Sequence, residues 1–215
     1  MIFTAFFLHN KLNSEDMKGF KKFGGEEIDD LGHYIREYLK KHNDVQIFVG
    51  CDSEQYKKFT KYAIVVCLYH TGKGAHVIFK TENAKCAEGR HLKVRNIGER
   101  LWSEVERVKE LADYLELVLE GHVRRFSVDE LILMDLESIQ TKLVEVHIDF
   151  NPNPNTPVVP SRYKRKRRAL RRMTDNKSNE LWAAAVSYLV GNGYRVKWKP
   201  NGFAASSAAD LICKK

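Results

Sequence analysis

Two acidic residues follow stretches of the chain where an apolar core is expected, which makes them candidates for chemistry. Asp52 comes directly after the apolar stretch VQIFVGC at 45–51, and Asp149 lies near the end of the alternating stretch LVEVHIDF at 143–150. A charged side chain buried without partners costs several kcal/mol, so each acid needs a cation, hydrogen-bond donors or water. Capping of the turn that follows is the alternative role for both.

A third acid, Glu104, lies on the apolar side of a predicted helix over 98–120. At about 100° per residue, Glu104 falls within the apolar stripe of this helix, whereas Glu99 and Glu106 project to the other side. The stripe therefore places Glu104 against the sheet, and a solvated acid at the helix rim is the alternative. The stripe consists of Leu101, Val105, Val108, Leu111, Ala112 and Leu115.

A fourth acid, Asp210, belongs to the small-residue stretch FAASSAADLIC at 203–213, which we expect to be helical. Alanine and serine along one flank would allow this helix to approach the sheet or a ligand backbone closely. The alternative for Asp210 is an exposed acid in the last helical turn, a position that the helix dipole mildly disfavours.

Clustered carboxylates around an open site are what Mg²⁺ or Mn²⁺ prefers, with water and phosphate completing the ligand shell. Two such ions about 4 Å apart can hold the attacking and leaving oxygens of a phosphodiester displacement. If the four acids converge, they predict a site with two ions in which an activated water attacks phosphorus. Its metal ligands, and its catalytic residues, would be Asp52, Glu104, Asp149 and Asp210.

The elements that must position these acids follow from hydrophobic periodicity and from breaker residues. The pattern predicts one α/β domain with a mixed sheet and helices on its faces. The stretch 125–135 fits a strand or a helix equally well. The predicted order is a helix over 26–41, strands over 45–53, 61–70 and 75–82, a helix over 98–120 ended by Gly121, a strand over 143–150, a helix over 178–191, a strand over 194–199 and a helix over 203–213.

Composition limits the class of protein. With 43% hydrophobic and 11% aromatic residues among 215, the chain can bury a core, and wholesale disorder is excluded. No apolar run approaches 18 residues, so a membrane span is not expected, and the N-terminal stretch lacks the basic region and cleavage site of a signal peptide.

The cysteines show no CxxC spacing, which indicates reduced thiols in an intracellular, cytoplasmic protein. The alternative of a zinc site formed by Cys86, His91, His70 and His76 matches no established zinc spacing.

A basic segment indicates the substrate class. The formal net charge is +8, and the stretch RYKRKRRALRRM follows the strand of Asp149. Such a run is typical of a solvated face or of an arm that contacts phosphates without reading sequence, and nuclear localisation is a further alternative. The predicted nucleic-acid contacts are Arg162, Lys164, Arg165, Lys166, Arg167, Arg168, Arg171, Arg172 and, in the last strand, Lys199.

The predicted arrangement of the four acids resembles that of the RNase H-like superfamily. One acid follows the first strand of a three-stranded meander, and a glutamate lies on the next helix. A third acid ends the fourth strand, and the last lies on the C-terminal helix. The strings FVGCDS, HIDFNP and KWKPNGFAASSAADL are similar to those of the YkuK family of predicted RNase H-like proteins, and the likeness spans about residues 20–213. The resemblance implies a five-stranded mixed sheet with strand 2 antiparallel, helices on both faces and convergence of the four acids. The basic run is longer than the family would lead one to expect.

These features together predict an N-terminal extension with an amphipathic helix over 1–43 and an RNase H-like domain over 44–215, with a basic insertion at 152–176. The expected function is that of a Mg²⁺- or Mn²⁺-dependent nuclease acting on RNA, an RNA–DNA hybrid or structured DNA. The alternative is a non-catalytic RNase H-like module that binds nucleic acid and keeps the acids for its fold or for weak metal binding. Substrate preference and oligomeric state stay open at this stage.

Overall fold

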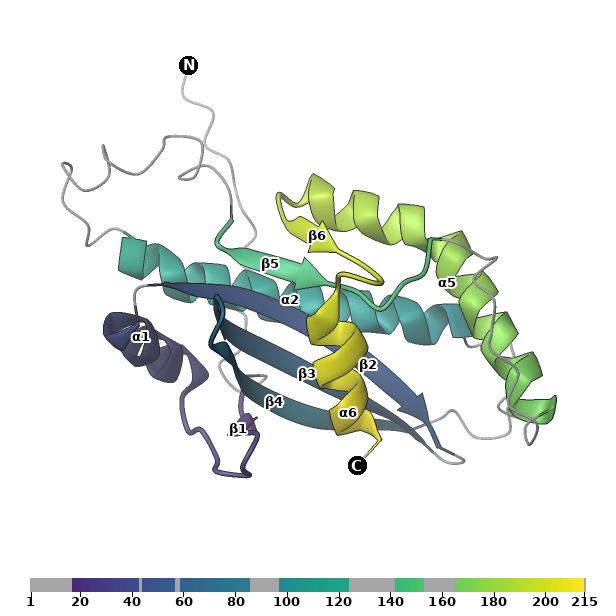
Figure 1. Ribbon diagram of the computed structural model, residues 1–215, viewed down its shortest axis with the longest axis horizontal. Coiled ribbons are helices and arrows are strands. Elements are labelled where there is room, and N and C mark those ends of the chain that lie inside the picture. The colour runs from purple at the N-terminus through teal and green to yellow at the C-terminus, as the bar shows by residue number, and fades with distance from the viewer. Residues whose placement is uncertain are drawn as a thin grey trace, which may run out of the picture.

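The computed structural model describes residues 17–42, 44–56, 59–85, 97–123, 142–152 and 165–214. They form a mixed sheet of six strands in the order β1-β4-β3-β2-β5-β6, with helices on both faces (Figure 1). The strands are β1 (Lys21–Lys22), β2 (Val45–Gln55), β3 (Phe59–His70), β4 (Gly74–Lys85), β5 (Val144–His147) and β6 (Arg195–Lys197). The helices are α1 (Leu31–Lys41), α2 (Ile97–Val123), α5 (Arg165–Gly191), a π-helical segment (Ala204–Ala209) and α6 (Asp210–Cys213).

The three central strands form the antiparallel meander that the sequence predicts. β2 pairs with β3, and β3 pairs with β4 along its whole length. β3 is buried from Tyr62 to Leu68, which explains its run of β-branched and apolar residues on both faces. The predicted mixed sheet with an antiparallel second strand is therefore confirmed.

The strand count differs from the predicted five, because Lys21 and Lys22 add a short edge strand. They pair antiparallel with Phe79 and Ile78 of β4, in a segment where the sequence indicates only a connector. At the opposite side, β5 pairs parallel with β2, and β6 pairs parallel with β5. The strand that carries Asp52 and the strand that leads to Asp149 are thus direct neighbours.

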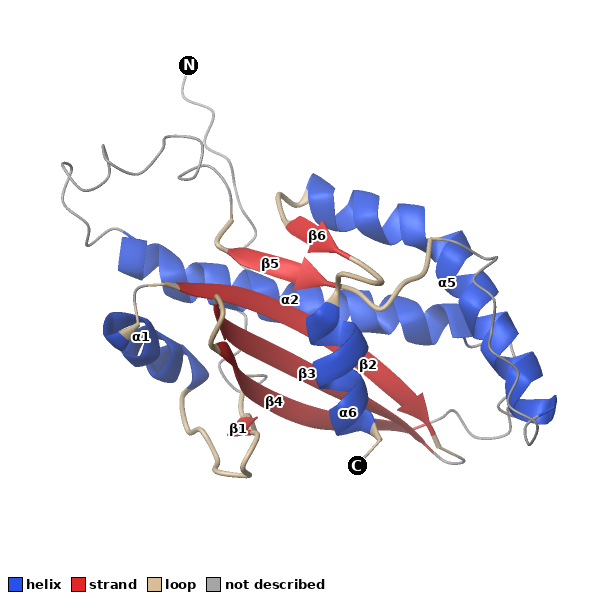
Figure 2. Ribbon diagram, in the orientation of Figure 1, coloured by secondary structure: helices blue, strands red, loops and turns tan. Residues whose placement is uncertain are grey.

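Helices cover the two faces of the sheet unequally. α1, α2 and α5 lie on one face, where they enclose the larger core around Leu31, Val105 and Leu189 (Figure 2). The π-helical segment and α6 cross the other face over β2 and β3 and enclose a smaller core with Phe48 and Val65. No helix in the described ranges is long and apolar enough to cross a membrane.

The C-terminal helical segment lies very close to the sheet because its residues are small. A Cβ atom on Gly50 of β2 would lie 2.5 Å from the backbone nitrogen of Ala205 and 2.6 Å from the carbonyl carbon of Ala204. Only glycine fits at this crossing, and alanine at the facing positions keeps the helix backbone near the strand. The expected close approach of the stretch 203–213 to the sheet is confirmed.

Three helix boundaries differ from those predicted. α1 begins at Leu31 rather than at residue 26, because the Asp30 side chain accepts a hydrogen bond from the His33 N–H and caps the helix there. α2 continues to Val123, so Gly121 does not end it. α5 begins at Arg165 and takes in much of the basic run, while residues 125–135 and 153–164 lie outside the described ranges.

Candidate active site

Asp52 lies within β2 and not at its end, because β2 continues to Gln55 and Asp52 pairs with Ala63 of β3. Side chains alternate along a strand, so Asp52 is on the same face as Gly50, the face covered by the C-terminal helical segment. The Cys213 thiol donates to the Asp52 carbonyl oxygen at 3.1 Å, which ties α6 to this point of β2. Asp52 is therefore enclosed by its own sheet and by α6.

Glu104 is buried, 3% exposed, and contacts β2 from the opposite face. The Ser53 hydroxyl donates to Glu104 Oε1. The Arg100 guanidinium donates to the Ser53 carbonyl at 2.7 Å and to its hydroxyl oxygen at 2.6 Å, and lies 3.6 Å from Glu104 Oε1. One serine and one arginine therefore stabilise a carboxylate that burial alone would neutralise.

Asp149 lies two residues beyond β5, because the strand ends at His147 and not at residue 150 as predicted. Its two oxygens have different surroundings. Lys199 Nζ lies 2.8 Å from Oδ2, whereas Oδ1 is buried and has no hydrogen-bond partner. Buried carboxylate oxygens are rarely left unpaired, so an unpartnered Oδ1 indicates a position that a cation or a water can fill.

Asp210 begins α6 and forms an ion pair with Lys214 one turn later, at 2.5 Å. It is the most exposed of the four acids, with 36% of its side chain accessible. The π-helical turn that precedes it sets its position, and such turns are frequent at functional sites.

The four carboxylates influence one another electrostatically. Burial, and then the neighbouring charge of Asp149, raises the pKa of Asp52 to about 7. Burial and the charge of Asp52 raise the pKa of Glu104 well above its usual range, against the influence of Arg100. Burial also raises the pKa of Asp149, which Lys199 opposes and Asp210 reinforces. Asp52 thus interacts electrostatically with each of the other three acids, and we call these four linked residues the acid cluster. A further cation beside them would relieve repulsion between like charges.

The cluster suits a divalent cation by the chemistry of its donors, which are hard carboxylate oxygens, and by the unpartnered Asp149 Oδ1. Across the described ranges, however, no three His, Cys, Asp or Glu side chains stand together as a ready-made metal cage. Asp149 and Asp210 each hold a lysine instead. An ion that binds Asp149 through Oδ2, or Asp210 through the oxygens that face Lys214, would compete with these lysines.

A buried pair that the sequence analysis missed connects β5 to the C-terminal segment. The Ala204 N–H donates to His147 Nδ1 at 3.1 Å, so His147 carries its proton on Nε2, which donates to Glu145 Oε1 at 2.9 Å. His147 also stacks on Phe48 with ring centroids 4.7 Å apart. The alternation of LVEVHIDF placed Glu145 and His147 on one face, and their burial beside Asp149 could have been considered from that pattern.

The predicted nucleic-acid contacts are only partly described. Arg162 and Lys164 lie outside the described residues. Lys199 contacts Asp149 and is 43% exposed. The remaining six belong to the first two turns of α5, of which the backbone alone is described: Arg165, Lys166, Arg167, Arg168, Arg171 and Arg172.

The alternative zinc site gains no support. Cys86 and His91 lie outside the described residues. The Nε2 atoms of His70 and His76 each lie 2.9 Å from a tyrosine hydroxyl, those of Tyr38 and Tyr34. The described cysteines Cys51, Cys67 and Cys213 are buried and free.

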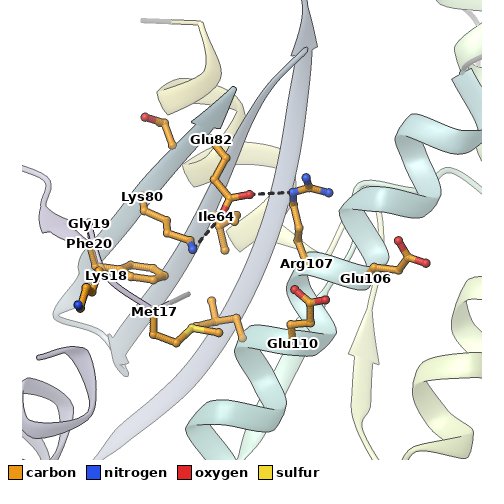
Figure 3. Close-up of a pocket in the computed structure, with 12 residues that line it drawn as sticks. Met17, Lys18, Gly19, Phe20, Ile64, Lys80, Glu82, Glu106, Arg107 and Glu110 are labelled. Atoms are coloured by element: carbon orange, nitrogen blue, oxygen red, sulfur yellow. Dashed lines mark hydrogen bonds and ion pairs between the residues drawn. The ribbon is translucent and has the colours of Figure 1, made fainter. Parts of the chain in front are cut away.

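A cavity of about 490 Å³ is lined by none of the four acids (Figure 3). It is bounded by the segment Met17–Phe20, by β4 and by α2. Glu82 on its wall contacts Lys80 at 2.8 Å and Arg107 at 3.1 Å. Because these charges are paired with one another across the cavity wall, the cavity does not indicate a ligand of one charge.

Comparison with known proteins supports the architecture. The family model described as Ribonuclease H-like matches residues 28–160, more than half of the chain, and so includes Asp52, Glu104 and Asp149 but not Asp210. Searches of curated proteins and of solved structures give no significant match. The matched range holds the meander, α2 and β5, the elements that carry three of the four acids. The chain belongs to the ribonuclease H-like family.

Proposed function

We propose that the protein is a YkuK-type nuclease that hydrolyses phosphodiester bonds with the help of Mg²⁺ or Mn²⁺. The observation that carries the proposal is the electrostatic coupling of acids on adjacent elements, three of them largely buried, with the pKa of Asp52 raised to about 7 by burial and by Asp149. Groups whose pKa values are strongly perturbed by burial and by a specific charged neighbour are concentrated at functional sites. The family match supports a nuclease-like or nucleic-acid-binding fold, over a range that contains three of the acids.

The proposed role of each acid follows from its place in the fold. Asp52 and Asp149, on neighbouring parallel strands, would hold the cations from the sheet, and Glu104 and Asp210 would complete the ligand set from the two faces. Two bound ions supply charge neutralisation at the phosphate and an activated water as nucleophile. In the hydrolysis, the new oxygen–phosphorus bond forms as the bond to the leaving oxygen breaks, and that oxygen gains a proton.

The substrate of the proposal is RNA, an RNA–DNA hybrid or structured DNA. The basic residues 165–172 open α5, which packs against α2 near the side of the sheet that carries β5 and β6 (Figure 1). Lysine and arginine in such a run would hold the phosphate backbone without reading sequence.

The test is cleavage of labelled single-stranded RNA, hybrid, duplex and junction substrates with Mn²⁺, Mg²⁺ or EDTA. We expect metal-dependent cleavage that falls at least about a hundredfold in Asp52→Asn and Asp149→Asn, since loss of a ligand should exceed the effect of losing an outer partner. Asp44→Asn is the matched control, because Asp44 precedes the other end of β2 and is 62% exposed.

Two results would contradict the proposal. Cleavage that survives both substitutions would place the chemistry elsewhere. Salt-sensitive binding of the same substrates without cleavage in any metal would favour the non-catalytic binding module, in which the lysine-paired acids serve the fold.

A further inference from the structure

We propose that Lys199 and Lys214 are exchangeable counter-ions of the acid cluster, which release their carboxylates when a divalent cation binds and then contact substrate phosphates. The inference rests on the proposed function and adds a role for two lysines at the same site. It follows from where these lysines lie, from what they contact and from how exposed they are.

Each lysine holds a carboxylate of the cluster from the solvent side. Lys199 Nζ lies 2.8 Å from Asp149 Oδ2, and Lys214 Nζ lies 2.5 Å from Asp210. The lysine side chains are 43% and 59% exposed, whereas those of the acids are 18% and 36% exposed. The carboxylates are therefore the enclosed partners, and the ammonium groups are free to turn outward.

The backbone of Lys199 is held in place by a hydrogen bond, whereas its ammonium group is partly exposed. Its backbone N–H donates to the carbonyl of Phe150, the residue that follows Asp149, at 3.3 Å. Lys214 is held in the same way by the last turn of α6, where its N–H donates to the Asp210 carbonyl at 3.2 Å. A lysine side chain anchored at its base can move its ammonium group by rotation about four flexible bonds.

The charges explain why a divalent cation should displace the lysines from the carboxylates. Asp149 keeps Oδ1 buried and unpartnered even though Lys199 holds Oδ2, so one ammonium does not satisfy this carboxylate. A divalent cation carries twice the charge and binds several carboxylate oxygens at once. Once it neutralises the cluster, both ammonium groups lose their partners beside the position where a phosphate would approach.

The exchange couples two binding events. In the absence of metal, the carboxylates hold the lysines and compete with phosphate for them. After metal binds, the lysines are available, so metal and nucleic acid should each strengthen the binding of the other, as linkage requires. This coupling can be measured without any cleavage.

The first measurement is calorimetric titration with Mn²⁺ at pH 8 of the wild type, Lys199→Gln and Lys214→Gln. Each substitution removes a competitor for a carboxylate, and we expect Mn²⁺ to bind about 1.5- to fivefold more tightly, the range for a partly exposed ion pair. The matched controls are Lys197→Gln, which neighbours Glu145 at 3.9 Å, and Lys109→Gln, whose i,i+4 pair with Asp113 lies outside the cluster. Their Mn²⁺ affinity should equal that of the wild type.

The second measurement is the salt dependence of binding to a labelled phosphorothioate oligonucleotide that resists cleavage. With Mn²⁺, the slope of log K against log salt should be smaller in Lys199→Gln than in the wild type by about 0.7, the value for one single-strand phosphate contact. In EDTA the two slopes should be equal, because Asp149 holds the ammonium group in the wild type.

The outcomes separate this inference from the proposed function. Unchanged or weaker Mn²⁺ binding in both lysine variants, or an equal gain in Lys197→Gln, would overturn the exchange while leaving the nuclease proposal intact. A slope difference of the same size in EDTA would also overturn it. If the wild type binds no Mn²⁺ at all, the metal site itself fails, and both proposals fail with it.

Discussion

Gly50 in β2 and Ala205 in the C-terminal segment meet backbone to backbone, with room for no more than a hydrogen between them: a Cβ atom on Gly50 would lie 2.5 Å from the Ala205 nitrogen. This crossing sets the height of α6 above the sheet. It thereby sets the distance between Asp52, two residues along β2, and Asp210 at the start of α6.

Gly50→Ala should therefore disturb the site as well as the fold. The added methyl group meets backbone that cannot rotate away, so we expect a loss of about 1–3 kcal/mol in the free energy of unfolding, as for other overpacked positions. Urea denaturation measures this loss, and Mn²⁺ titration of the folded variant should show weaker binding. Gly24→Ala is the control, because nothing lies within 4 Å of the added atom. Equal stability of the two variants would contradict the close approach of Gly50 to the backbone of Ala205.

Asp52→Asn should stabilise the protein at alkaline pH. The pKa of Asp52 rises from its ordinary 3.8 to about 7, chiefly through burial, so the folded state binds more protons than the unfolded state between these values. Stability contributed by the protonated form is present below about pH 4 and is lost as the pH rises to about 7.

Asparagine carries no charge, so the variant does not lose the stability that the wild type loses when Asp52 ionises. At pH 8 and without metal, Asp52→Asn should be more stable than the wild type by up to about 4 kcal/mol, at about 1.4 kcal/mol per pKa unit. At pH 4 the difference should be small. Thermal or urea unfolding across this range measures it, and a difference independent of pH would refute the assignment.

Arg100→Met should destabilise the protein most where Glu104 is ionised. Burial raises the pKa of Glu104 and Arg100 opposes that rise, so removing the guanidinium leaves an uncompensated buried carboxylate. Breaking a buried pair in this way costs about 3 kcal/mol or more. We expect a larger loss at pH 8 than at pH 5, measured by urea denaturation.

The double variant Arg100→Met with Glu104→Gln tests the cause of that loss. Without the buried charge, the pH dependence of the destabilisation should disappear, although the lost hydrogen bonds to Ser53 still lower stability. A pH dependence that persists in the double variant would assign it to another group.

His147→Phe should lower stability at pH 7.5 by about 2–3 kcal/mol, because the buried Ala204 N–H and the Glu145 carboxylate each lose a partner. The pKa of His147 is lowered, chiefly by burial, so the wild type loses stability as the pH falls below 6.5 and the unfolded chain takes up the proton. The variant should lose less over the same range. An exposed-site change, His33→Phe, is the control, and identical acid profiles for His147→Phe and the wild type would contradict this account.

Much of the architecture could be predicted from periodicity. The alternation in 45–53 and 143–150 identified the strands, and the apolar stripe of α2 identified Glu104 as the acid that faces the sheet. The ends of elements were harder to predict because they depend on partners. β2 runs past Asp52 since β3 pairs with it as far as Gln55 and Thr60, which no local pattern in 45–55 reveals.

The partners of the site residues could be predicted only where they lie one helical turn away, as Arg100 does from Glu104 and Lys214 from Asp210. Ser53 contacts Glu104 only because β2 and α2 cross, and 51 residues separate the two in the sequence. Lys199 was expected to contact nucleic acid, and its ion pair with Asp149 depends on the parallel pairing of β5 with β6. Spacing along the chain therefore indicates pairs within one helix but not pairs between different elements.

The parallel pairing of β2 with β5 also has a consequence for the order of folding. β2, β3 and β4 close through short turns, whereas Ile47 must find Val144 across α2 and the residues that follow it. Contacts between distant segments form late, because the chain must first lose the entropy of closing a long loop. The meander with Asp52 should thus gain protection from hydrogen exchange before β5 and β6, and the four carboxylates should come together only at the last step, so that a half-folded chain carries no assembled site.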